Sequence, residues 1–297
     1  MKHSLTVLCA AVLAASCTIM PEPVPVNIIF MGKAPVEVKS GSPDGSDIGK
    51  LDLLVFRSRD GMLLDKCSCI GNLPLEVSVP SGQECRWYII ANAPEDFDGC
   101  TTLEEFLSKE VRLTDGPVMH SEGVSVFRES GTTVQAQLSR FACKVGVSRI
   151  CMNWADALPC ILETIALTNV LETTSTGLSM TGTYLNCGVV SEDLGGLLAQ
   201  HPGIEITSHE PLDIGITLAC MPSSGRTRLA LCIIAPDGPN WYPIDLPQME
   251  GNHYYLVDNL VINGPGAPDV DMPVERTPVD FSVHVKPWED YSVPIQL

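Results

Sequence analysis

Short runs of alternating apolar and polar residues, separated by turn residues, constrain the fold of this chain more than any other feature. A period of two places apolar side chains on one face of a strand, whereas a helix needs a period near 3.6. The runs that favour strands cover residues 50–61, 73–82, 85–97, 131–150, 161–175, 213–222, 227–236, 253–264 and 279–290. Helical spacing occurs at 101–110, where Thr101 or Thr102 is the expected N-cap, and weakly at 192–200. The sequence therefore predicts an all-β protein with few short helices.

The length of the chain predicts two domains. Roughly 280 residues follow residue 16, which is more than a single hydrophobic core usually organises. We expect two consecutive β-sandwich domains, an N-terminal one at 17–137 and a C-terminal one at 138–297. The run at 131–150 reads as one strand that crosses this boundary, so the two domains are expected to abut rigidly.

The first residues have the parts of a lipoprotein signal peptide. A short basic stretch at Lys2 is followed by an apolar run of about 11 residues, and small residues precede Cys17. This run is roughly half the ~20 residues that a membrane-spanning helix needs, so no transmembrane helix is expected. We predict that residues 1–16 are removed and that Cys17 is lipidated (palmitate), which anchors the protein on a membrane. The alternative is an ordinary signal cleaved at residues 14–16.

The net charge of the chain narrows the classes of partner that it can bind. The formal net charge of −18 disfavours nucleic acid and anionic lipid headgroups as partners, because binding to either requires a basic patch.

Ten of the twelve cysteines follow residue 17, and Cys143, Cys220 and Cys232 lie in apolar, strand-like runs. They are expected to be structural thiols, and structural disulfides are the alternative. The sequence does not determine which cysteines would pair. Cys67 and Cys69 lack the second pair that zinc would require.

The sequence offers no convincing catalytic or metal site. It contains no nucleophile elbow, zinc-protease motif or phosphate loop. His120 and Glu122 would share one strand face, as half of a metal site or as an exposed polar edge. Asp269 and Asp271 lie in a Gly/Pro loop but lack the remaining positions of a calcium loop. We predict no enzyme activity, no catalytic residue, no metal and no cofactor.

Tryptophan side chains are the sequence's candidates for stacking on a sugar. Trp87 lies in an apolar strand and is expected in the core, whereas Trp154 is the better candidate for an exposed aromatic.

Several stretches, in the right order from end to end, resemble the fimbrillin superfamily of Bacteroidales, the lipoprotein pilins and minor subunits of type V pili. They are the signal ending at Cys17, "LDLLVFRSRDGMLL" (51–64), "LEVSVPSGQECRWYIIANAP" (75–94), "TLEEF" (102–106), "VMHSEG" (118–123), "VQAQLSRFACKVGV" (134–147) and the closing region from Gly251 to Asp290. The closing region is the most specific match, with its Tyr-x-Val-x-Asn-Leu pattern and final Val-x-x-Trp-Glu.

The resemblance implies two transthyretin-like β-sandwich domains and a non-enzymatic role as a fimbrial (pilus) subunit or adhesin, in the stalk, at the tip or as the anchor. Its partners would be other fimbrial subunits, joined by donor-strand β-augmentation, and a host or bacterial surface ligand. The resemblance places the protein at the outer membrane and cell surface. In the family a protease that prefers arginine removes the first strand, which corresponds to residues 23–30 here. The first arginine is Arg57, inside the second strand, so Lys33 and Lys39 are the candidate processing sites.

Two alternatives stay open at the sequence level. The apolar ending at 291–297 is either the last strand of its own domain or a donor strand for a neighbour. The chain as a whole is alternatively a monomeric surface lipoprotein that binds glycan through exposed aromatic side chains and the Gly/Asp loop.

Overall fold

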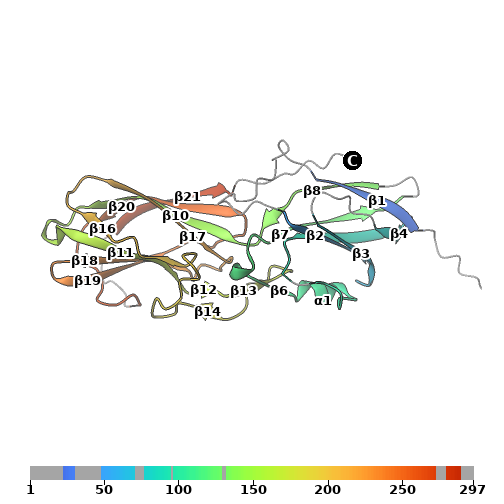
Figure 1. The fold of residues 1–297 in the computed structure, drawn as a ribbon, viewed down its shortest axis with the longest axis horizontal. Helices are drawn as coiled ribbons and strands as arrows, with labels where there is room; N and C mark the ends of the chain where they lie inside the picture. The colour runs from blue at the N-terminus through green and yellow to red at the C-terminus, as the bar shows by residue number, and fades with distance from the viewer. Residues whose placement is uncertain are drawn as a thin grey trace, which may run out of the picture.

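A computed structural model describes residues 23–30, 48–70, 77–94, 96–128, 132–271 and 279–288. Cys17, Lys33, Lys39 and the ending 291–297 lie outside the described residues. Almost every described element is a strand, and the two halves of the molecule lie end to end along its long axis (Figure 1). We call residues 23–140 the first half and residues 143–288 the second half. The predicted all-β class is confirmed.

The first half has two layers. The main sheet has the order β3-β2-β5-β7-β9, and a smaller sheet has the order β4-β1-β8. The main sheet consists of β2 (Lys50–Arg57), β3 (Leu63–Ile70), β5 (Glu84–Ala91), β7 (Met119–Val126) and β9 (Ser139–Arg140). The smaller sheet consists of β1 (Pro23–Phe30), β4 (Ser78–Pro80) and β8 (Thr132–Ala136).

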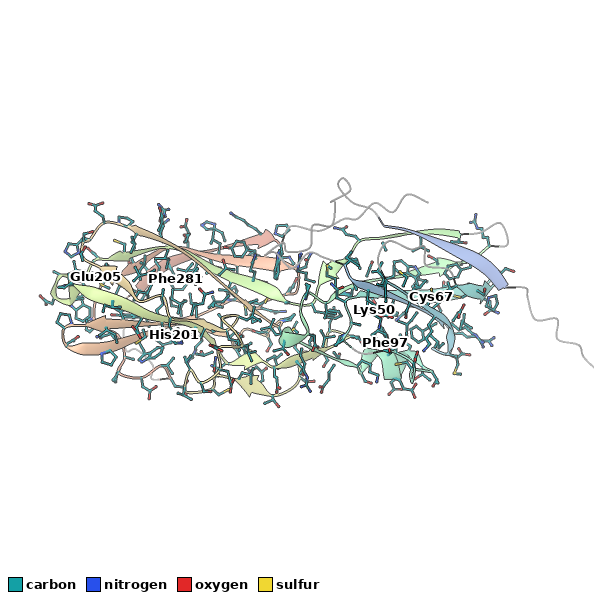
Figure 2. The ribbon with its side chains drawn as sticks, in the orientation of Figure 1. Lys50, Cys67, Phe97, His201, Glu205 and Phe281 are labelled. Carbon is teal, nitrogen blue, oxygen red and sulfur yellow. The ribbon has the colours of Figure 1, made fainter. Side chains whose placement is uncertain are left out.

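The centre of the main sheet of the first half is buried on both faces, which explains the nearly continuous apolar run of β2. Leu53 and Val55 point to a core shared with the smaller sheet, whereas Leu54 and Phe56 point to a core on the opposite face. Alternating residues of a strand point to opposite faces, so two-sided burial selects apolar residues at every position. Figure 2 places Phe97 toward α1 on one side of this sheet and Cys67 toward β1 on the other.

The predicted helix at 101–110 is confirmed but is shorter. It is α1 (Leu103–Leu107), capped by Thr102, whose hydroxyl accepts a hydrogen bond from the Glu105 amide while the Glu105 carboxylate accepts one from the Thr102 amide. Phe106 anchors the helix, with its ring centroid 4.9 Å from that of Tyr88. The helix therefore closes one face of the main sheet.

The second half is a sandwich of two larger sheets, with the orders β17-β10-β20-β21 and β15-β11-β18-β19, where β16 also pairs with β11. The first sheet consists of β10 (Cys143–Met152), β17 (Leu212–Cys220), β20 (His253–Ile262) and β21 (Val279–Pro287). The second consists of β11 (Cys160–Thr168), β15 (Ala199–Gln200), β16 (Ile204–Ile206), β18 (Arg228–Ala235) and β19 (Gly238–Asp245).

Short strands join the two halves. β6 (Glu110–Arg112) of the first half pairs antiparallel with β13 (Thr173–Ser175) of the second. Nearby in the chain, β12 (Val170–Leu171) pairs with β14 (Tyr184–Leu185) within the second half. Two single-turn 3-10 helices cover Leu113–Asp115 and Ala155–Ala157. One core of buried side chains includes Phe56 and Phe106 from the first half and Leu171 and Leu231 from the second. The halves are thus packed against each other.

The expectation of one strand over 131–150 is wrong. The chain forms β8, β9 and β10, which belong to three different sheets. Leu138 between β8 and β9 is buried in the core under the smaller sheet, whereas Phe141 between β9 and β10 is buried in the other core. The continuous apolar pattern therefore reflects a chain that passes between two cores.

The weak helix expectation at 192–200 is also wrong. Residues 194–196 all have positive φ angles, with Leu194 at 47°, Gly195 at 69° and Gly196 at 90°, and this geometry makes turns before β15. Paired glycines outweigh the helical spacing of the leucines because they relieve the steric cost of that backbone conformation. β19 was not expected either, since Pro239 and Pro243 disfavour a strand; it is tolerated at the end of the sheet order.

Candidate strand-exchange site

The N-terminal strand β1 occupies a distinctive place in the first half. Its first three residues pair antiparallel with β4, from Pro23↔Pro80 to Pro25↔Ser78. Its last five residues pair parallel with β8, from Val26↔Thr132 to Phe30↔Ala136. β1 is the middle strand of the smaller sheet, and it lies across the top of the first half in Figure 1. The expectation of a strand at 23–30 is confirmed.

The smaller sheet covers a distinct apolar core. This core, which we call the acceptor core, contains Val79 of β4, Val134 and Ala136 of β8, and apolar side chains that the main sheet points toward them. The main-sheet contributors are Leu51, Leu53, Val55, Cys69, Cys85, Trp87, Ile89, Ala91 and Met119. Val79 is 0% exposed and Val134 is 4% exposed. The strands β4, β1 and β8 together thus form the lid of this core.

Loss of β1 would separate β4 from β8 and leave the facing backbone groups of both strands without ladder partners. Unpaired strand edges next to buried apolar side chains invite another extended segment, because ladder hydrogen bonds and apolar burial are then restored together. Chemically, the arrangement can bind an extended strand. The resemblance to fimbrillins implied β1, but the sequence did not identify β8 as its partner, although Val134, Ala136 and Leu138 alternate as a half-buried strand should.

The candidate metal ligands do not form a metal site. His120 of β7 is half buried and its ring lies 4.5 Å from that of Phe141, while Glu122 is exposed. Burial lowers the pKa of His120, and the negative charge of Glu122 opposes that effect. Asp269 accepts a hydrogen bond from the Asp271 amide. Within the described ranges, no group of three or more His, Cys, Asp or Glu side chains is arranged to hold a metal ion.

The tryptophans are distributed over both halves. Trp87 is 5% exposed in the acceptor core, which confirms the prediction, and its indole nitrogen donates to Ser125. Trp154, expected to be the exposed aromatic, is half buried and packs on the core that joins the halves. Trp241 lines a hollow of about 280 Å³ together with Asp269.

The ring of Trp288 lies 4.7 Å from the Arg140 guanidinium carbon and 5.0 Å from Lys144 Nζ. Cations positioned over an aromatic face are attracted to it, so Trp288 contacts one basic side chain from the end of the first half, Arg140, and one from the start of the second, Lys144.

All ten cysteines after residue 17 are free thiols in the structure. Cys143, Cys220 and Cys232 are buried, as expected for small apolar groups in strands. Cys67 and Cys69 lie two positions apart on β3, where Cys69 is buried in the acceptor core and Cys67 packs against it. The part of the chain that the structure describes contains no helix long and apolar enough to cross a membrane.

The fold built from two stacked sheets in each half is similar to the folds of solved Bacteroidales fimbrillins and candidate cell adhesion proteins. No family model matches the sequence, and no curated protein matches it. Solved structures do match along most of the chain, which confirms the resemblance at the level of the fold.

Three of these structures show the extent of the likeness. A candidate cell adhesion protein from Bacteroides eggerthii is 16% identical, with a TM-score of 0.66 over 91% of this chain and 97% of that one. One from Parabacteroides distasonis is 13% identical, with a TM-score of 0.62 over 90% and 100%. The fimbrilin FimA from Porphyromonas gingivalis W83 is 13% identical, with a TM-score of 0.58 over 91% and 98%.

Proposed function

We propose that this protein is a non-enzymatic fimbrial subunit or adhesin that assembles by exchange of β1. The observation that carries the proposal is the placement of residues 23–30 as the middle strand over the acceptor core. A strand from the end of a chain can leave without breaking the connections of the remaining sheet. A donor segment from a second subunit would then pair with β4 and β8 in its place.

Burial makes an empty acceptor site costly and its refilling favourable. Removing apolar surface from water contributes about 25 cal/mol per Å², and the acceptor core includes the large side chains of Trp87 and Met119. The backbone hydrogen bonds also fix the direction of the incoming strand, because it must run parallel to β8 and antiparallel to β4. An incoming strand must satisfy both.

The events at the N-terminus complete the proposal. In it, residues 1–16 are removed, Cys17 carries the lipid that holds the subunit at the cell surface, and cleavage after Lys33 or Lys39 frees β1. The domain division at residue 137 belongs to the same proposal, with the exchangeable strand in the first domain. Support comes from the signal-like sequence before Cys17 and from the fold shared with a fimbrilin.

A proteolysis experiment tests the proposal. Full-length protein is treated with a low dose of a trypsin-like protease, followed by N-terminal sequencing and gel analysis without boiling. We expect loss of β1 after Lys33 or Lys39 and a ladder of oligomers. The Lys33→Gln/Lys39→Gln variant is the matched control and should keep β1 and stay monomeric.

Peptides identify the exchanged strand. A synthetic PVPVNIIF peptide (residues 23–30) should suppress the ladder, whereas the same peptide with Ile28→Pro should not, because Ile28 lies opposite Val134 within the β8 ladder. Cleaved protein that remains monomeric and binds neither peptide would contradict strand exchange.

A further inference from the structure

Two cysteines that are far apart in the sequence meet in the second half. Cys143 is the first residue of β10 and Cys220 is the last residue of β17, and the antiparallel register places them directly opposite each other. Their sulfur atoms lie 3.4 Å apart, although 77 positions separate them in the chain. Both residues are 0% exposed.

The surroundings of the pair hold both thiols in place. Cys143 Sγ donates toward the Cys220 carbonyl oxygen at 3.3 Å and lies 3.8 Å from the Met221 carbonyl oxygen. The side chains belong to the apolar core that joins the two halves. No rearrangement of strands is needed to bring the sulfur atoms together.

We propose that Cys143 and Cys220 form a cross-strand disulfide in the mature protein. Residues directly opposite in an antiparallel pair have Cα atoms about 4.5–5.5 Å apart, which falls inside the ~4.4–6.8 Å range that a disulfide accepts. Rotation of the two side chains must shorten the sulfur–sulfur distance to about 2.05 Å. The inference does not depend on strand exchange at β1.

The bond forms by exchange with an oxidised dithiol carrier, either a small-molecule disulfide or a thiol–disulfide oxidoreductase. The thiolate of one cysteine attacks a carrier sulfur, forms a mixed disulfide and expels the first carrier thiolate. The second cysteine thiolate attacks the mixed disulfide at the protein sulfur and expels the other carrier sulfur. The protein loses two electrons and two thiol protons, and the carrier is recovered as two thiols.

This exchange belongs to folding and not to the finished structure. The hydrogen bond with Cys143 and complete burial raise the pKa of the Cys220 thiol well above its ordinary value, which leaves little reactive thiolate. A carrier also cannot reach two sulfur atoms enclosed in the core. The bond must therefore form before β17 docks on β10, and protein that folds reduced will oxidise slowly.

The position of the pair gives the bond a structural role. β17 comes first in its sheet order and pairs with β10. The bond would attach the end of β17 to the start of β10, which follows β9 in the chain. Closing a loop of this length restricts the unfolded chain strongly. The bond would keep an outer strand attached at the junction of the two halves.

The test uses the full chain, refolded with oxidised and reduced glutathione. Free thiols are alkylated in denaturant without reductant, and peptides are mapped by mass spectrometry. We expect a peptide pair linked through Cys143 and Cys220. We also expect protein that is refolded and scanned in reductant to have a thermal midpoint about 5–10 °C below that of the oxidised protein.

Variants separate the bond from general effects of reductant. The Cys143→Ala/Cys220→Ala variant should have a midpoint that reductant does not change. Cys160→Ala, at a buried thiol of β11 in the facing sheet, should keep the linked peptides and the full reductant effect. Quantitative alkylation of Cys143 and Cys220 in the refolded wild-type protein would overturn the proposal, and this readout needs no variant to fold.

Discussion

The two halves of the molecule complete their sandwiches in different ways. In the second half, both sheets are built from residues 143–287, and each has at least four strands. In the first half, the smaller sheet has three strands, and the middle one comes from the start of the chain. The acceptor core beneath that sheet consists of first-half residues alone, whereas the other core runs through both halves.

This difference shows where the fold can change partners. Apart from the final strand β21, taking a strand out of the second half would require two cuts, because the chain continues into other strands on both sides of it. Taking β1 out of the first half requires a single cleavage, and it opens the core that is not shared with the second half. The second half thus builds both of its sheets from its own strands, whereas the first half depends on β1, the strand whose exchange we propose.

Removal of β1 should have the largest effect. A variant that starts at Ile48 should lose protection of the main sheet of the first half, because the lid contributes a large part of the ~5–15 kcal/mol by which a domain is usually stable. Hydrogen exchange should accelerate in β2 and β5 and stay slow in β11 and β18. Equal acceleration in both halves would contradict the view that the halves differ.

Two glycines, one in each half, sharpen the comparison. A Cβ at Gly123 of β7 would lie 2.7 Å from Cε2 of the Trp87 ring, which is buried in the acceptor core. Gly123→Ala should therefore cost about 1–3 kcal/mol of stability through overpacking. A Cβ at Gly146 of β10 would lie 2.7 Å from the Tyr254 ring, but this ring is half exposed and can rotate away.

Gly146→Ala should consequently change stability by no more than about 0.5 kcal/mol. Urea denaturation of both variants measures the difference. An equal or larger loss for Gly146→Ala would show that the two aromatic side chains are held equally firmly.

Mild acid should have the smallest effect, and it should come from the first half. Burial lowers the pKa of His120 below its ordinary 6.5, so the unfolded chain takes up a proton first as the pH falls. Stability is then complete above about pH 6.5 and declines below it, until the lowered pKa in the folded state is reached.

Thermal scans between pH 7.5 and 5 measure this decline, which His120→Gln should remove. The carboxyl groups with lowered pKa, such as Asp96 and Asp258, take up protons only near or below their ordinary pKa of 3.8, which is below the pH range of these scans. A decline that persists unchanged in His120→Gln would assign it to other groups.

Local patterns predicted the strands well wherever one element used one pattern. β2, β18 and β20 lie within runs whose alternation or β-branched content favours strands, and β5 and β17 each begin one residue before such a run. Capping residues also predicted where α1 begins, since Thr102, one of the two expected N-caps, caps the helix. Prediction failed at 131–150 and at 192–200, because there one apolar pattern served two cores and paired glycines imposed positive φ angles.

The sequence by itself determined that this protein is all-β and that several of its cysteines sit at apolar positions, and its resemblance to fimbrillins implied a strand at 23–30. Only the tertiary structure decided that β1 joins β4 to β8 and that Cys143 faces Cys220. The reason is that alternation along a strand is local information and fixes which side chains share a face. Partner and register join residues far apart in the chain, and they depend on how two layers together bury one core.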